Sequence, residues 1–225
     1  MSPRPYKMER RRAAADQTRT RILQAARRLL LAEDFREFTM EAVAKLADVS
    51  RLTVYYQFDS KAGLLEALYD SIARNGHLGR LPEVFRAGND ALQKHYNFVG
   101  VFVDFWASDR FVIRRLHALG AIDREIGTGL RARNERRGNG LRVIFEHYAR
   151  FHPFTPPEEP VVLDKLHMLT SFETFDALAG SGRTVQEVFK IIWKMAEQAV
   201  KFSPPPAHPI VMPSLKVPRR RRSRS

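Results

Sequence analysis

Residues 39–58 read TMEAVAKLADVSRLTVYYQF. This stretch contains two short runs in which apolar residues recur at helical spacing, separated by Asp48 and Val49. Thr39 and Ser50 stand just before the two runs, where a hydroxyl can accept a hydrogen bond from a backbone N–H group of the first helical turn. The stretch therefore predicts two short helices joined by a tight turn.

The second of these helices has an unusual composition on its outer face. At 100° per residue, Val54 and Phe58 fall on the side that must face the core. The opposite side holds tyrosines, a threonine and a leucine, which suit a DNA groove because hydroxyls bond phosphates or base edges and a leucine methyl group can contact thymine. The pair thus predicts a helix-turn-helix, whose second helix enters the major groove. The candidate DNA-binding residues at this helix are Ser50, Arg51, Leu52, Thr53, Tyr55, Tyr56 and Gln57.

Helical spacing continues on both sides of this pair. One helix is predicted from Thr18 to about Asp34, and another from Ser60 to about Gly76. We find no strand-like alternation in the sequence, so the predicted fold class is all-α, with an N-terminal three-helix DNA-binding domain and a larger helical domain. The longer helices of the second domain are predicted near 90–107, 109–120, 123–151, 159–179 and 184–202, with a break at Gly79–Pro82 before them.

Several short elements around the helix-turn-helix follow one another in register and without a gap. They are Ile22-Leu23-Gln24-Ala25-Ala26, Val43-Ala44, Asp48-Val49-Ser50, Tyr55-Tyr56-Gln57-Phe58 and Ser60-Lys61. With these elements, the stretch from Thr18 to Leu68 resembles the DNA-binding domain of TetR-family repressors. The family usually has glycine where this chain has Asp34 and Asp48. Aspartate can adopt the same left-handed backbone at some cost in strain, so we expect the geometry to be kept.

The resemblance implies DNA contacts for two more residues. Lys61, at the start of the next helix, would contact a phosphate with the help of the positive helix N-terminus, and Thr39 would do likewise. Otherwise Lys61 would be a surface lysine and Thr39 only a cap, and Tyr56 could pack within the small domain. The resemblance also implies a C-terminal domain that forms a homodimer and binds a small-molecule effector, which releases the repressor from its operator.

The last two predicted helices, 159–179 and 184–202, are apolar over a wide arc. The core of a monomer uses one stripe of each helix, so the excess favours a second surface that a partner buries. By the resemblance, that partner is a second copy of the chain. Two copies would read two half-sites of a double-stranded DNA operator.

Aromatic residues gather on the helix predicted at 90–107 and on helices that could pack against it. One interpretation is a pocket for a lipophilic or aromatic effector, and the other is ordinary core packing. The candidate pocket residues are Phe102, Phe105, Trp106, His117, Phe145, Tyr148 and Phe172.

The net charge of +13 is concentrated at the two ends of the chain. Residues 1–21 have a net charge of +5 and residues 216–225 of +6, whereas residues 39–61 have none. Basic arms of this kind are typical of proteins that contact a polyanion, although such segments can also be merely solvated. We divide the chain into a basic flexible arm (1–16), a helix-turn-helix domain (17–75), a helical effector-binding and dimerisation domain (76–202) and a Pro/Arg-rich disordered tail (203–225).

Other classes of function find little support in the sequence. The absence of cysteine excludes disulfides and thiolate metal sites. The seven histidines show no metal-ligand spacing with carboxylates, and the glycine-rich stretches lack the lysine of a phosphate loop. We therefore expect no enzyme, no metal and no cofactor. No apolar run approaches the roughly 18 residues of a membrane span, so we expect no membrane contact. The resemblance to TetR-family repressors implies a bacterial, cytoplasmic and nucleoid-associated protein.

Three hypotheses for the function follow. The leading one is a dimeric, effector-responsive repressor that binds a DNA operator. The second is a non-enzymatic architectural nucleic-acid-binding protein that acts through its basic arms. The third is a helical small-molecule binder or enzyme whose first domain is vestigial. Sequence-selective DNA binding separates the first hypothesis from the other two.

Overall fold

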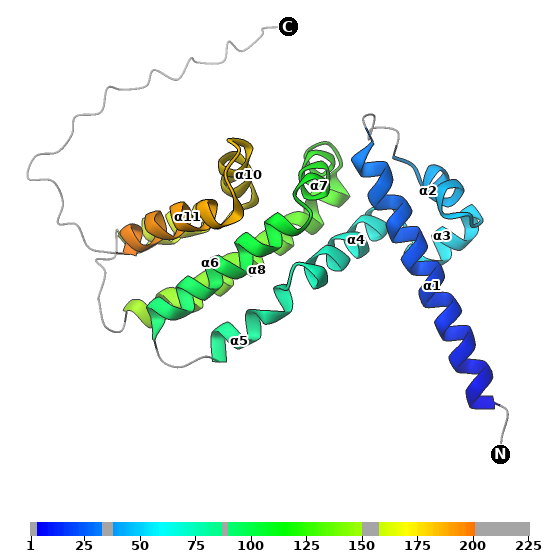
Figure 1. Ribbon diagram of the computed structural model, residues 1–225, viewed down its shortest axis with the longest axis horizontal. Helices are drawn as coiled ribbons and strands as arrows, with labels where there is room; N and C mark the ends of the chain where they lie inside the picture. Colours follow the sequence, from blue (N-terminus) through cyan, green and yellow to red (C-terminus); the bar gives the residue numbers. More distant parts are fainter. Residues whose placement is uncertain (1–3, 33–37, 87–89, 150–157, 201–225) are drawn as a thin grey trace, which may run out of the picture.

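The computed structural model describes residues 4–32, 38–86, 90–149 and 158–200. All regular structure within these ranges is helical, which confirms the predicted all-α class (Figure 1). The helices are α1 (Arg4–Leu31), α2 (Met40–Ala47), α3 (Arg51–Phe58), α4 (Lys61–Asn75), the short η2 (Leu78–Arg80), α5 (Leu81–Arg86), α6 (Ala91–Ser108), α7 (Arg110–Ile122), α8 (Arg124–Ala149), α9 (Glu158–Leu169), α10 (Phe172–Gly180) and α11 (Val185–Val200).

The first four helices form the N-terminal domain. In Figure 1, α2 and α3 lie on one side of α1, and α4 lies on the other. The apolar stripe of α1 is enclosed between them, with Ile22 and Leu30 fully buried. α3 contributes Val54 and Phe58 to the same core, as predicted. Since burying one such side chain contributes roughly 1.5–3 kcal/mol, this core fixes the orientation of α3 against α1.

The first helix was predicted to begin at Thr18, after a basic flexible arm over residues 1–16, and this start was wrong, because α1 begins at Arg4. The segment is rich in arginine and alanine, which are strong helix formers, and Pro5 stands in the first turn, where its missing N–H group is tolerated. Residues 8–17 are all exposed. This part of α1 projects from the molecule as a basic helical rod (Figure 1).

In the larger domain, α6 occupies the centre. It packs against α4 and α5 as well as against α8 and α11, and residues such as Phe98 and Phe105 are almost completely buried. α7 lies beside α8 and also contacts α1, which joins the two domains. The cavity described below lies against α6.

Two predicted boundaries in this domain were wrong. The break expected at Gly79–Pro82 holds η2 and the start of α5, because Pro82 falls in the first turn of α5, a position that suits proline. The single helix expected at 159–179 is divided into α9 and α10. Ser171 starts the second of these, since its hydroxyl accepts a hydrogen bond of 3.2 Å from the backbone N–H of Thr174.

Some predictions fall on other parts of the chain. The helix stop at Asp34 and the tail at 203–225 lie outside the described residues. Within the described ranges, none of the helices is both long and apolar enough to cross a membrane.

Candidate DNA-binding surface and effector cavity

Two side-chain caps define the helix-turn-helix. The hydroxyl of Thr39 accepts a hydrogen bond of 3.1 Å from the N–H of Ala42, and that of Ser50 accepts one of 3.0 Å from the N–H of Thr53. Between the helices, Asp48 has φ 52° and ψ 54°, the left-handed conformation that glycine usually provides. The expectation that aspartate keeps this geometry is confirmed.

The orientation predicted for α3 is also confirmed. Val54 and Phe58 are buried, whereas Leu52 is 76% and Tyr56 86% exposed. The alternative in which Tyr56 packs within the small domain is therefore wrong. The other predicted residues of the helix differ in exposure: Ser50 and Arg51 are exposed, and Thr53, Tyr55 and Gln57 are half-buried.

Arg51 and Tyr55 are arranged as a pair on the outer face of α3. The Nη2 atom of Arg51 lies 3.5 Å from the Tyr55 hydroxyl, and its guanidinium lies 5.4 Å from the centre of the Tyr55 ring. Both distances are at the long end of such contacts, so the pair holds the guanidinium near the helix surface and leaves its N–H groups available to another acceptor.

Three further residues lie around α3, the helix predicted to contact base edges, which we call the reading helix. Thr39 is exposed, and Lys61 is half-buried with its Nζ atom 5.7 Å from the ring of Phe38. Arg19 was not predicted as a site residue, because in the sequence it is one of several charges near the N-terminus. Arg19 donates a hydrogen bond of 3.1 Å to the carbonyl of Gln57 and lies 4.4 Å from the centre of the Phe58 ring. It therefore fastens the last turn of α3 to α1.

A cavity of about 440 Å³ lies in the larger domain, against α6. It is bounded by residues of α4, η2, α5, α6, α7, α8 and α10, and its size is that of a typical small-molecule site. Five of the seven predicted pocket residues line it: Phe102, Phe105, Trp106, His117 and Phe172.

Phe145 and Tyr148 are not among the residues that line this cavity, so their inclusion in the predicted pocket was wrong. The cavity meets α8 between Leu130 and Gly140, whereas Phe145 and Tyr148 lie one to two turns further along the helix. There Tyr148 packs edge-on against His95, with ring centres 6.0 Å apart.

The cavity also has a basic wall that was not predicted from the sequence. Four arginines of α8 line it, together with Tyr69 of α4 and Glu173 of α10. The run RARNERR at residues 131–137 was a visible signal, but its position opposite the aromatic residues depends on the tertiary fold. The four arginines are Arg131, Arg133, Arg136 and Arg137.

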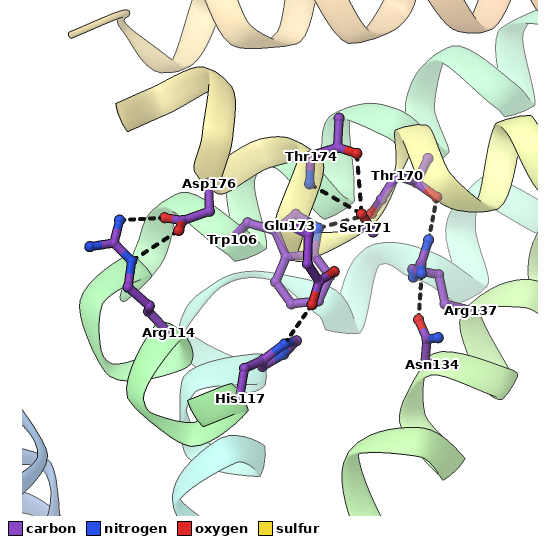
Figure 2. A network of polar contacts seen from close by, with 10 residues as sticks. All are labelled: Trp106, Arg114, His117, Asn134, Arg137, Thr170, Ser171, Glu173, Thr174 and Asp176. Atoms are coloured by element: carbon purple, nitrogen blue, oxygen red, sulfur yellow. Dashed lines mark hydrogen bonds and ion pairs between the residues drawn. The ribbon is translucent and has the colours of Figure 1, made fainter. Parts of the chain in front are cut away.

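Polar contacts around the cavity tie α7, α8 and α10 together (Figure 2). The Nδ1 atom of His117 lies 2.9 Å from a carboxylate oxygen of Glu173, and this contact holds the pKa of Glu173 at about 2, below its ordinary value. Trp106 donates a hydrogen bond of 3.0 Å from its indole N–H to the carbonyl of Thr170. The α9–α10 junction is therefore held directly behind the cavity.

The cavity and the helix-turn-helix share α4. Tyr69 and Ala73 of α4 line the cavity, and α4 also packs against α1 and α3. Arg133 of α8 holds α4 by an ion pair of 2.9 Å with Asp70 and lies 4.7 Å from the centre of the Tyr69 ring. A second link joins the domains where Arg27 of α1 pairs with Asp109, N–O 2.6 Å.

Comparisons with known proteins agree with this arrangement of a helix-turn-helix before a larger helical domain. Residues 22–68 match the family model described as bacterial regulatory proteins of the tetR family. The N-terminal domain of this chain is therefore similar to the DNA-binding domain of that family.

Curated relatives align over about a third of the chain or less. The HTH-type transcriptional regulator TtgR of Pseudomonas putida is 35% identical over 77 residues, which are 34% of this chain and 37% of that protein. UidR of Escherichia coli, an HTH-type transcriptional regulator, is 38% identical over 61 residues, 27% of this chain and 31% of its own length. The chain thus matches about a third of the length of these relatives.

Solved structures share the fold over most of the chain. A TetR transcription regulator from Haloarcula marismortui has a TM-score of 0.63 at 15% identity, covering 82% of this chain and 97% of its own. A TetR-like transcriptional regulator from Rhodococcus sp. RHA1 has a TM-score of 0.57 at 18% identity, covering 81% of this chain and 95% of its own. At these identities the likeness establishes the fold.

Proposed function

We propose that the protein is a sequence-specific DNA-binding transcriptional regulator that acts as a homodimer and is released from its operator by a small molecule bound in the cavity. The observation that carries this proposal is the outer face of α3. Leu52 and Tyr56 expose large apolar surfaces on the second helix of a correctly capped helix-turn-helix, where a DNA groove would cover them.

The positions of the charged residues support separate roles for different helices in DNA binding. The exposed helical extension of α1 carries Arg11 and Arg12, which would attract the phosphate backbone. Thr39 and Lys61 would hold phosphates at the N-termini of α2 and α4, where the helix dipoles favour an anion. α3 would supply the contacts to base edges.

Exposed apolar side chains on the last helices support a second copy of the chain as the partner. Val161 and Met168 on α9 are 49% and 57% exposed, and Val185 and Met195 on α11 are 42% and 45% exposed. A partner that covered them would place two reading helices on one DNA duplex. Light scattering should report a dimer, and Met168→Glu with Met195→Glu should shift it towards the monomer.

Release by a ligand would act through α4. A ligand in the cavity would touch Tyr69 and Ala73, and a displacement of α4 would be passed to α1 and α3, which it contacts. A ligand shifts the equilibrium between a conformation that binds DNA and one that does not only by binding one of the two more tightly. The proposed effector must therefore fit the cavity better in the conformation that does not bind DNA.

Fluorescence anisotropy with the DNA upstream of the gene, against a scrambled duplex of equal length, tests the proposal. Leu52→Ala and Tyr56→Ala should each abolish the preference for the specific duplex, because both side chains point outward and their loss leaves the core intact. Ile122→Ala is the control, since Ile122 is 79% exposed at the end of α7.

The outcomes of this test separate the hypotheses. Binding that ignores sequence and persists in both α3 variants would favour an architectural nucleic-acid-binding protein. The absence of any DNA binding would favour a small-molecule binder with a vestigial first domain.

A further inference from the structure

One charged side chain in the wall of the cavity is buried. Arg137 of α8 is only 5% exposed, and it is among the residues that line the cavity. Burial lowers its pKa to about 10, which still leaves the guanidinium positively charged at neutral pH. A buried charge is costly unless an opposite charge compensates it, so the partners of Arg137 are informative.

The partners of Arg137 are neutral groups. It donates a hydrogen bond of 2.6 Å to the carbonyl of His167. It also donates to the hydroxyl of Thr170 at 2.5 Å and to the side-chain oxygen of Asn134 (Figure 2). In the described part of the chain the structure contains no ion pair between Arg137 and a carboxylate. Glu173 lines the same cavity, but its carboxylate is bonded to His117.

The end of α9 compensates the charge in part. His167 lies in the last turn of α9, where the free carbonyls carry about half an elementary negative charge. This contact alone would make Arg137 a helix cap with a residual positive charge. The other arginines of the wall differ from it, since Arg133 is paired with Asp70 and Arg136 is exposed.

The part of the cavity wall next to Arg137 is apolar and aromatic. Phe98 and Phe102 of α6 lie there with Trp106 and Phe172, and the guanidinium of Arg137 lies 6.0 Å from the centre of the Phe102 ring. A charge at the edge of an aromatic cavity selects a ligand with two parts, because the rings favour an apolar body and the guanidinium favours an anion.

We propose that the ligand of this cavity is an apolar or aromatic molecule with one anionic group, and that Arg137 binds that group while the phenylalanine rings and Trp106 enclose its body. The proposal rests on the effector role proposed above for the cavity. It adds the charge of the ligand and the residue that recognises it. With a neutral ligand of the same shape, only the end of α9 and the more distant Glu173 carboxylate, which is bonded to His117, would offset the charge of the guanidinium.

Two fluorescent probes with the same ring system test this directly on the full chain. Anilinonaphthalene sulfonate carries an anionic group, and N-phenylnaphthylamine is the same molecule without it. The measured quantity is the preference for the anion, defined as the Kd of the neutral probe divided by the Kd of the anionic probe at one site per chain. We expect a preference of roughly tenfold or more, as charge-assisted hydrogen bonds provide.

The variants then assign the preference to one residue. Arg137→Gln should abolish it while leaving the affinity for the neutral probe within about twofold, and Arg137→Lys should keep part of it. Arg142→Gln is the matched control, because Arg142 is an exposed arginine of the same helix that does not line the cavity. It removes the same charge and should leave the preference unchanged.

A preference near one in the wild-type protein would overturn the inference without any variant, even if Arg137→Gln fails to fold. Equal losses in Arg137→Gln and Arg142→Gln would overturn it as well, since they would indicate general attraction to a basic surface. These results are independent of DNA binding. A chain that selects the anionic probe through Arg137 but binds no DNA would contradict only the proposed regulator function, and the reverse pattern would contradict only this inference.

Discussion

The junction between α3 and α4 depends on a glycine. A Cβ atom at Gly63 would lie 2.2 Å from the carbonyl oxygen of Phe58, well inside van der Waals contact. The oxygen belongs to the backbone at the end of the reading helix, so it cannot rotate away as a flexible side chain would. Gly63→Ala must therefore displace either the end of α3 or the start of α4.

The size of the effect follows from two opposing contributions. Alanine stabilises a helix interior by about 1 kcal/mol relative to glycine. Overpacking typically costs about 1–3 kcal/mol, and a clash against backbone belongs at the upper end of that range. We expect Gly63→Ala to lower the free energy of unfolding by about 1–2 kcal/mol. DNA affinity should fall as well, because α3 would no longer hold its angle to α1.

Urea unfolding followed by circular dichroism measures the first effect, and anisotropy with specific DNA at a temperature where the variant is folded measures the second. Gly79→Ala is the matched control, since a Cβ atom there would meet nothing within 4 Å. Its free energy of unfolding should stay within about 0.5 kcal/mol of the wild type or rise. A Gly63→Ala protein as stable as the control, with unchanged DNA affinity, would refute the reasoning.

Three further changes test other parts of the molecule. Asp48→Gly should raise the free energy of unfolding by about 0.5–1 kcal/mol in urea, because Asp48 has φ 52° and glycine adopts this left-handed conformation without strain. An unchanged free energy of unfolding would indicate that aspartate is unstrained there. Ser171→Ala should cost about 1 kcal/mol, as the loss of an N-cap usually does, and an unchanged urea midpoint would show that α10 needs no cap. Glu173 has a pKa of about 2, lowered chiefly by its contact with His117. Its contribution to stability is therefore present above its ordinary pKa and is lost as the pH falls towards 2. Glu173→Gln should flatten this acid dependence in thermal melts, and a pH profile identical to that of the wild type would count against the contact.

The helix-turn-helix was predictable because its signals are local. Thr39 and Ser50 cap the helices that directly follow them, and Val54 and Phe58 point inward because of helical spacing alone. No distant contact is needed to explain these features. A fifty-residue stretch with consistent local signals therefore yields both the motif and its exposed face.

The wrong predictions concern segments in which local composition and tertiary contacts favour different structures. Residues 4–16 were interpreted as an arm because they lack apolar side chains, yet arginine and alanine form a helix without any packing. The break between α9 and α10 falls at Thr170, a buried residue whose hydroxyl accepts a hydrogen bond from Arg137, thirty-three positions away. The spacing of apolar residues along one helix gives no information about that contact.

The same reason explains why only part of the cavity was predicted. Phe102 and Trp106 share a face of α6 with the residues that line the cavity, so their spacing placed them correctly. Tyr148 was grouped with them because it is aromatic, but its position on α8 brings it to His95 instead. The arginines were overlooked because a charged run on a long helix is usually a solvated face.

The proposed attraction to DNA and the proposed selection of its sequence fall on different helices, and α1 joins them. Residues 39–61 have no net charge, so the helix-turn-helix itself offers little long-range attraction. The excess of basic residues lies instead at the two ends of the chain. At the N-terminal end, Arg11 and Arg12 lie on the projecting part of α1, which is continuous with the segment that packs against α2 and α4. Arg19 stands between these two parts and binds the carbonyl of Gln57 at the end of α3. The orientation of the charged rod is therefore tied to that of the reading helix, whereas a flexible arm would leave the two independent.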